Sequence, residues 1–322
     1  PARGVQRLHV EPVSRASLRQ RMGRCGRVRP GVCVRLFAEE EVAERAEFTD
    51  PEIRRSSLAG VILRMKLLGL PELDHFPLLD PPSAKLVSEG YRTLREIGAL
   101  DGERRLTDIG RKLARLPIDP RLARMLMQAE REECLAELLV IVAGLEVNDV
   151  RERPAEKTAE ADKAHAAWVD GESDFRGLLR LWLDLVSMRE RRRWRKGPLH
   201  KFCRKRFLNW RRVIEWGNLR DELEEVLRRE CRWKVRPLAA KLDGTAAYDK
   251  VHRSLLAGVP RQFALVDRGE KVYRSAAGIS FAIFPGSGLF GLQRPEWVLG
   301  FELVETTRLW ARRVAKIDPV WV

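Results

Sequence analysis

Three arginines at regular spacing near the start of the chain could contact a phosphate group. They belong to the run Gln20-Arg21-Met22-Gly23-Arg24-Cys25-Gly26-Arg27. Residues three apart share a face of a helix, so a helix here would present Arg21, Arg24 and Arg27 together, and glycine lets a phosphate approach closely. Such a face suits a triphosphate. The alternative is an exposed basic helix, but each glycine would cost such a helix about 1 kcal/mol relative to alanine.

A second candidate site is a basic segment interleaved with aromatic residues. Residues 187–241 hold 19 lysines and arginines against 7 acidic residues, a net charge of +12 within a chain total of +15. Arginine makes salt-dependent contacts with phosphates, so the charge favours a nucleic-acid partner, with Arg191, Arg192 and Arg193 as predicted contacts. Aromatic rings can stack on unpaired bases, but packing in a helical core is the favoured interpretation here. The aromatic residues are Trp194, Phe202, Phe207, Trp210, Trp216 and Trp233.

A third candidate is a strand-like run near the end of the chain, residues 308–316. Alternation along a strand would place a basic and aromatic set on one side: Arg308, Trp310, Arg312 and Lys316. The small and apolar residues Leu309, Ala311 and Ala315 would lie on the other side. A small β-barrel can bind a single strand with such a face, and an ordinary exposed strand is the alternative.

Other apparent motifs do not predict a site. Asp221-Glu222-Leu223-Glu224 resembles a metal-binding motif but lies inside an amphipathic helix. Gly286-x-Gly288-x-x-Gly291 fits a dinucleotide fingerprint, yet Arg294-Pro295-Glu296 stands where its helix should begin, so we expect a loop. Five scattered histidines and five cysteines without a C-x-x-C pair predict neither nucleophilic catalysis nor a metal site.

The composition indicates a globular protein of about two to three domains. The chain has 322 residues, of which 44% are hydrophobic and 33% charged. Its longest apolar run, Leu138 to Leu145, is too short to cross a bilayer, so no membrane partner is expected. The chain opens at Pro1 without an apolar leader, which leads us to expect a portion of a longer protein in a reducing, cytoplasmic setting.

The elements that must position these residues are mainly helices. Val32–Phe37 is a strand-like run, and a helix of about 18 residues is predicted from a cap at Thr49-Asp50-Pro51-Glu52 to Gly69. Two further helices complete a compact unit, the last capped at Thr107-Asp108. Residues 119–236 are predicted to be helical throughout, including Arg121 to Val147. After a short helix at 246–256, five strands are predicted at 263–266, 271–274, 279–284, 297–304 and 307–316.

The arginine-rich run resembles the last conserved helicase motif of superfamily 2, in the form carried by DEAH-box RNA helicases. Further stretches resemble landmarks of that family in the same order, and the last two resemble its bacterial HrpA-type members. They are Phe48 to Ile53, Leu106 to Pro120, Arg151 to Pro154, Ala161 to His165, Ser173 to Phe175, Phe284 to Phe290 and Leu303 to Trp310. The resemblance therefore covers essentially the whole chain.

The resemblance implies a multidomain fold, mainly α with a small β-barrel. Its expected parts are the tail of a second RecA-like α/β domain at 1–48, a winged helix at 49–118, a helical ratchet-like bundle at 119–241 and an OB-fold at 242–322. It also implies that Gln20, Arg24 and Arg27 face the nucleotide, with Arg24 and Arg27 as arginine fingers on the γ-phosphoryl group. The chain has no G-x-x-x-x-G-K-[ST] loop, so we expect the C-terminal portion of an enzyme that is inactive alone. ATP and Mg²⁺ would belong to the full-length enzyme.

By this resemblance the full-length protein is an ATP-dependent RNA helicase that couples hydrolysis to translocation and unwinding. Single-stranded RNA is the expected partner, a ribosome or ribonucleoprotein is a conceivable setting, and a monomer is the expected state. The alternative is a non-catalytic RNA-binding or adaptor module built from helicase accessory domains, for which Arg24 and Arg27 would have no use. A peripheral membrane protein is less favoured, because no helix pairs the basic run with a bulky apolar face.

Overall fold

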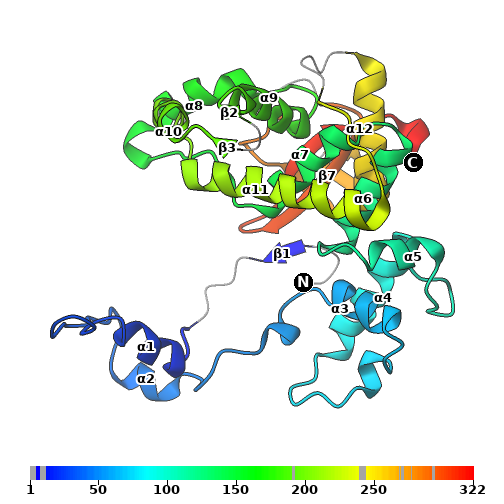
Figure 1. Cartoon of the computed structure of the whole chain (residues 1–322). Helices are drawn as coiled ribbons and strands as arrows, with labels where there is room; N and C mark the ends of the chain where they lie inside the picture. Colours follow the sequence, from blue (N-terminus) through cyan, green and yellow to red (C-terminus); the bar gives the residue numbers. More distant parts are fainter. Residues whose placement is uncertain are drawn as a thin grey trace.

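The computed structural model of the chain is a largely helical body with a small sheet on one side (Figure 1). It describes residues 5–7, 12–190, 193–238, 244–267, 269, 272–276, 278–291 and 294–322. Within these residues, no helix combines the length and the apolar character needed to span a membrane.

The N-terminal part contains one short strand and two short helices, namely β1 (Val5–Arg7), α1 (Arg15–Met22) and α2 (Glu40–Glu44). Figure 1 shows α1 and α2 together, away from the main body. α1 ends at Met22 with Gly23 as its C-cap, and Gly26 adopts a φ of +82°. The prediction that Arg21, Arg24 and Arg27 share one helix face is therefore wrong, because glycines end the helix and Arg24 and Arg27 follow it in turns.

The strand predicted at Val32–Phe37 does not form. Val32, Val34 and Leu36 are 87%, 77% and 95% exposed. A strand needs a neighbour to satisfy its backbone hydrogen bonds, and none of the described strands pairs with this segment.

Three α-helices follow, α3 (Ala59–Leu67), α4 (Ala84–Glu96) and α5 (Asp108–Leu113). The helix predicted from Thr49 begins later than expected, because Glu52–Arg54 form only a 3-10 turn and Ser56 donates to the Glu52 carboxylate at 3.4 Å. Its predicted end at Gly69 is confirmed, with φ at +67°. Thr107 caps α5 as predicted by accepting the backbone N–H of Gly110 at 3.0 Å.

The helical pattern predicted for residues 119–236 is interrupted at several points, two of which are a turn at Glu133 and a pair of short strands. Glu133 adopts a left-handed φ of 58°, which divides Arg121–Val147 into two helices. Two short strands, β2 (Arg189–Glu190) and β3 (Arg193–Trp194), pair in antiparallel fashion. The helices of the bundle are α6 (Pro120–Arg131), α7 (Leu135–Glu146), α8 (Thr158–His165), α9 (Asp174–Val186), α10 (Lys196–Lys205), α11 (Trp210–Val226) and α12 (Thr245–Gly258).

Helix α7 forms the centre of the bundle because nearly all of its residues are buried. Trp216 of α11 is fully buried and donates its indole N–H to the Val140 carbonyl at 2.9 Å. A Cβ at Gly144 would lie 3.1 Å from that indole ring, so glycine permits the close approach of α11 to α7.

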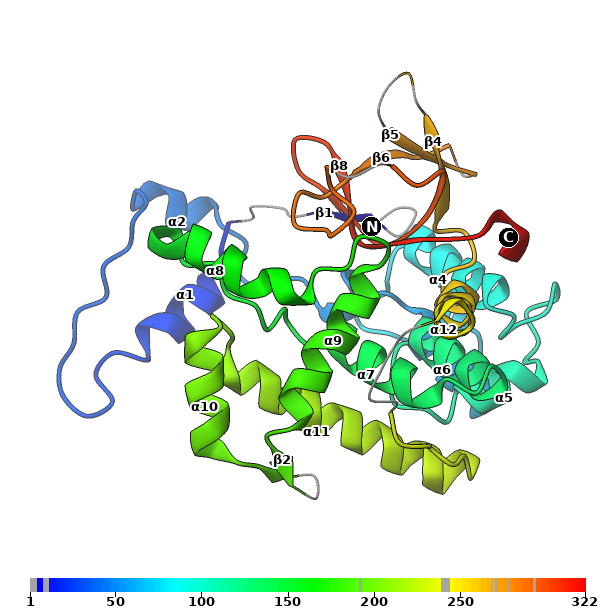
Figure 2. The same ribbon diagram turned by 90° about the horizontal axis from the view of Figure 1, so that it is seen from above.

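All five strands predicted near the end of the chain are present. Each of the five pairs with two of the others, and the pairings β4–β5, β5–β6, β6–β8, β8–β7 and β7–β4 make a closed circuit. In addition, β1 pairs with β7 in parallel. Figure 2 shows these strands gathered at one end of the helical body. The strands are β4 (Phe263–Asp267), β5 (Val272–Ser275), β6 (Ser280–Ile283), β7 (Trp297–Glu305) and β8 (Leu309–Lys316).

Candidate nucleic-acid interface

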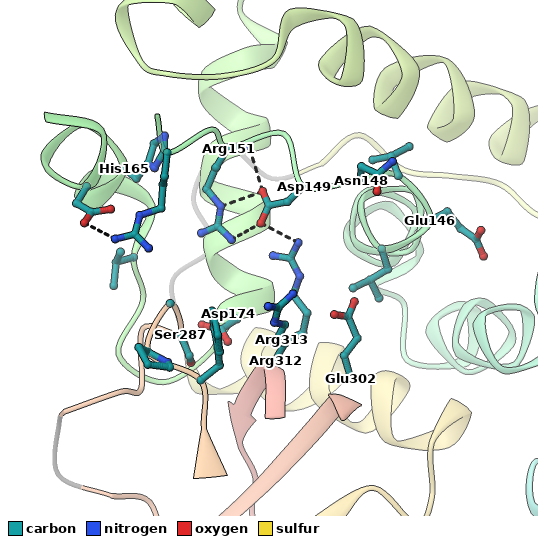
Figure 3. A pocket seen from close by; sticks show the side chains of 18 residues that line it. Glu146, Asn148, Asp149, Arg151, His165, Asp174, Ser287, Glu302, Arg312 and Arg313 are labelled. Carbon is teal, nitrogen blue, oxygen red and sulfur yellow. Dashed lines mark hydrogen bonds and ion pairs between the residues drawn. The ribbon is translucent and has the colours of Figure 1, made fainter. Parts of the chain in front are cut away.

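A cavity of about 710 Å³ opens between the helical bundle and the sheet (Figure 3). Its bundle wall is the end of α7, the loop that carries Asp149, Arg151 and Arg153, and part of α8. Its other wall is the loop after β6 together with residues of β7 and β8, including Arg312 and Arg313. The cavity therefore depends on how two parts of the chain far apart in sequence are held together.

Asp149 is the centre of an ion-pair network in this cavity. Its two carboxylate oxygens accept from Nε and Nη2 of Arg151 at 3.1 and 2.8 Å, and Oδ2 lies 3.3 Å from Nη2 of Arg313 on β8 (Figure 3). The Asp149 carbonyl accepts from Arg212 at 2.8 Å. Removal from water would raise the pKa of Asp149, but hydrogen bonds from Arg151 and the charge of Arg313 hold it well below its usual range. The carboxylate is therefore ionised and bridges the bundle to β8.

Asp174, the first residue of α9, makes a second bridge between the same two parts. Its carboxylate accepts the backbone N–H of Gly288 at 2.9 Å and that of Val314 at 2.8 Å. Arg313 has a left-handed φ of 57°, which interrupts the regular alternation predicted for this strand. A Cβ at Gly288 would lie 2.2 Å from the Asp170 carbonyl oxygen, so only glycine fits this approach.

Cations and aromatic rings alternate along the start of β8 and into the cavity. The Arg308 guanidinium lies 4.1 Å from the centre of the Trp310 ring, and Trp310 meets Phe284 edge-on at 6.0 Å. The Arg312 guanidinium lies 4.4 Å from the centre of the Phe284 ring. We call these four side chains the arginine–aromatic ladder. Arg312 and Phe284 also line the cavity, and the buried Nε of Arg312 has no hydrogen-bond partner within the described part of the chain.

The histidine among the described residues that line the cavity is engaged in hydrogen bonds. His165 donates Nε2–H to the carbonyls of Arg206 and Phe207 at 3.0 and 3.2 Å, because a carbonyl can only accept. Burial lowers its pKa, so this imidazole is neutral and already engaged at pH 7. The cavity instead offers guanidinium groups and an aromatic ring beside several carboxylates.

The predicted contact residues near the end of the chain are brought together in part. Arg308, Trp310 and Arg312 lie in the ladder as their alternation predicts, whereas Lys316 is at the far end of β8, 3.4 Å from Glu172. In the basic segment, Arg193 is exposed on β3, while Arg191 and Arg192 lie outside the described residues. Gln20, Arg24 and Arg27 are exposed in the N-terminal part and do not line the cavity.

Five of the six aromatic residues of the basic segment pack inward, as the favoured interpretation predicts. Trp194, Phe202, Trp210 and Trp233 contact the bundle core, and Trp216 is fully buried in it. Asp221, from the rejected metal-like motif, makes an ion pair with Arg189. Among the described residues, no group of three or more histidine, cysteine or acidic side chains could hold a metal ion.

Sequence reasoning did not single out Asp149, Arg151, Asp174 and Phe284 as site residues. Arg151 and Asp174 stand in stretches that resemble family landmarks, and Phe284 precedes the glycine-containing loop. For Arg151, Asp174 and Phe284, these positions were the only available signal. Asp149 had none, because its partner Arg313 lies 164 residues away in sequence.

Three protein-family models match the chain. They are described as a helicase associated domain (HA2), winged-helix, at residues 91–118, a helicase associated domain (HA2), ratchet-like, at 119–208, and an oligonucleotide/oligosaccharide-binding (OB)-fold at 251–322.

Two curated proteins are similar over 99% of the chain. An ATP-dependent RNA helicase HrpA homolog from Haemophilus influenzae is 42% identical over 326 residues, and ATP-dependent RNA helicase HrpA from Escherichia coli is 41% identical over 324. The alignments cover 24% of each relative, so the chain spans about a quarter of their length.

Proposed function

This chain belongs to the HrpA-type DEAH-box RNA helicase family, and from that membership we propose that it is the C-terminal portion of an ATP-dependent RNA helicase. Its own contribution to that activity is to bind single-stranded RNA. ATP hydrolysis in the full-length enzyme then drives translocation and unwinding of the bound strand.

The domain division that we propose follows the sequence boundaries. Residues 1–48 are the tail of a second RecA-like domain, 49–118 the winged helix, 119–241 the ratchet-like bundle and 242–322 the OB-fold. The matched family models and the closed circuit of β4 to β8 support this division, with the circuit as the OB barrel.

The arginine–aromatic ladder is the observation that carries RNA binding. Trp310 and Phe284 provide ring faces on which unpaired bases can stack, and Arg308 and Arg312 provide charge for the phosphates between those bases. Arg151 and Arg153, from the opposite wall, face the same cavity. Arg191, Arg192, Arg193 and Lys316 are proposed as further phosphate contacts along the path of the strand.

ATP and Mg²⁺ act in the full-length enzyme, with Gln20, Arg24 and Arg27 facing the nucleotide. Two features support this role: the motif that these residues form, and the absence of any side-chain partner for Arg24 or Arg27 within the described part of the chain. Arg24 and Arg27 would stabilise charge that develops on the transferred phosphoryl group. The chain alone, without a phosphate-binding loop, is expected to show no ATP turnover.

The test is the affinity of this chain for a labelled single-stranded oligoribonucleotide. Trp310→Ala should weaken binding about 5- to 150-fold, because stacking contributes about 1–3 kcal/mol per base. Phe48→Ala removes another exposed ring, 68% exposed and far along the chain from the ladder, and serves as the matched control. An unchanged affinity of Trp310→Ala for the oligoribonucleotide would mean that β8 is an ordinary exposed strand with no role in RNA binding.

A further inference from the structure

The outer face of α10 carries a concentration of positive charge that the cavity does not use. Residues 193–212 contain nine lysines and arginines and no acidic residue. Leu199 and Cys203, one helical turn apart, are buried against the bundle, which directs Lys201, Arg204 and Lys205 to solvent. With Arg195 and Lys196 before them, these residues form what we call the α10 basic face.

The charges on this face are not neutralised by the chain itself. No ion pair joins Lys201, Arg204 or Lys205 to an acidic side chain among the described residues, whereas two arginines farther along the chain are paired. Arg220 pairs with Glu224, and Arg228 pairs with Glu225. Three unpaired cations on adjacent turns repel one another, so a polyanion gains more by binding here than at the paired arginines.

The α10 basic face shares no residue with the lining of the cavity. None of the residues that line the cavity belongs to β2, β3 or α10. Helix α9 starts at Asp174, beside the cavity, and ends near β2, about 20 Å away at 1.5 Å per residue. Helix α10 starts after β3 and ends next to Arg206, whose carbonyl accepts from His165 in the cavity lining, so the face extends toward the cavity. Figure 2 shows α10 and β2 toward the end of α9 that is remote from the sheet.

The chemistry of this face fits a phosphate backbone and offers little for unpaired bases. Phe202 and Trp194 point into the bundle core, where Trp194 meets Trp182 edge-on at 6.1 Å, and Trp210 is partly buried beside His200. Stacking on single strands needs accessible ring faces, and these three rings pack against the hydrophobic core instead. A helix whose exposed side chains are mainly cationic binds a duplex by its shape and charge and not by its sequence.

We propose that the α10 basic face binds the phosphate backbone of double-stranded RNA. This inference rests on the proposed function only in that the chain acts on RNA. One chain would then hold a duplex on α10 and the adjoining single strand at the ladder.

The test compares two RNA probes and two triple variants of the chain. Lys201→Gln, Arg204→Gln and Lys205→Gln together remove three unpaired charges. Arg105→Gln, Arg228→Gln and Arg229→Gln together remove three exposed arginines that are paired with acids, and match the change in net charge. The probes are a blunt RNA duplex and an unstructured single strand of the same length. The melting temperatures of the two protein variants check that both are folded.

The α10 variant should lose at least about tenfold in duplex affinity at ~100 mM salt, and the salt dependence should become shallower by about 0.9 per lost phosphate contact. Its affinity for the single strand and the duplex affinity of the control should change less than about twofold. Unchanged duplex binding would overturn the proposal. Equal losses on both probes would make α10 part of the single-strand path. Polyglutamate serves as a third probe, and a loss of affinity for it without any loss on either RNA would assign the face to an acidic protein. A failed Trp310→Ala test would refute the ladder and leave the duplex measurement valid.

Discussion

The carboxylate of Asp174, at the start of α9, accepts the backbone N–H of Val314 in β8 at 2.8 Å across 140 residues of sequence. The positive end of the helix dipole also stabilises a negatively charged aspartate at this position. The same carboxylate holds Gly288, so one side chain fixes two segments of the sheet region against the bundle. The shape of the cavity depends on this contact.

We expect Asp174→Asn to lower the free energy of unfolding by about 1–3 kcal/mol. Asparagine keeps the size of the side chain, but its amide nitrogen would face one of two backbone N–H donors and leave it unsatisfied. Urea unfolding checks this. Asp162→Asn, at the exposed pair with Arg153, is the control and should cost less than about 1 kcal/mol. Equal costs for the two variants would contradict a special role for Asp174.

Stability should fall between pH 6.5 and 4 because of His252. Its fully buried ring lies 2.7 Å from Ser173 Oγ and 2.7 Å from the Tyr248 carbonyl, and burial lowers the pKa to about 4. Below pH 6.5 the unfolded chain takes up a proton that the folded chain refuses, so the unfolding free energy decreases by up to about 3 kcal/mol as the pH approaches 4.

His252→Gln should flatten this pH dependence, as measured by denaturant unfolding at several pH values. His75→Gln removes an exposed histidine, and its unfolding free energy should change with pH as that of the parent does. An unchanged slope in His252→Gln would show that another group takes up the proton.

Cysteine reactivity should divide the five thiols into two groups. Burial raises the pKa of Cys134 and of Cys203 to about 11, and it also raises the pKa of Cys231, whereas Cys25 and Cys33 are exposed. At pH 8 an alkylating reagent should modify Cys25 and Cys33 first, because the thiolate is the reactive form. Peptide mass spectrometry over time measures this order, and rapid labelling of Cys203 would contradict the packing of α10 on the core.

In the full-length enzyme, Arg24→Lys and Arg27→Lys should reduce ATP turnover far more than nucleotide affinity. Arginine fingers contribute about 10³- to 10⁵-fold to the rate in related systems, and a lysine ammonium does not reproduce the planar guanidinium. Affinity for RNA without nucleotide should remain near that of the parent. Arg21→Lys is the matched control, and near-parental turnover in both test variants would refute the finger assignment.

The parts of the fold that could be predicted from the sequence depend on local patterns. The alternation that marks β4 to β8, the cap at Thr107 and the inward position of Trp216 all follow from neighbouring residues. The prediction that Val32–Phe37 forms a strand is wrong because a strand requires a partner that the pattern cannot reveal.

The candidate site could be predicted only in part, for the same reason. The positions of Arg308, Trp310 and Arg312 follow from spacing along one strand. The bridge from Asp149 to Arg313 joins residues 164 apart, and no local signal indicates such a contact.

Small β domains that expose a strand edge can recruit a strand from another molecule and aggregate. Because β4 to β8 pair in a closed circuit, each of these described strands has a paired neighbour on both sides. We therefore expect this region to resist intermolecular strand addition, and self-association of the chain to begin elsewhere.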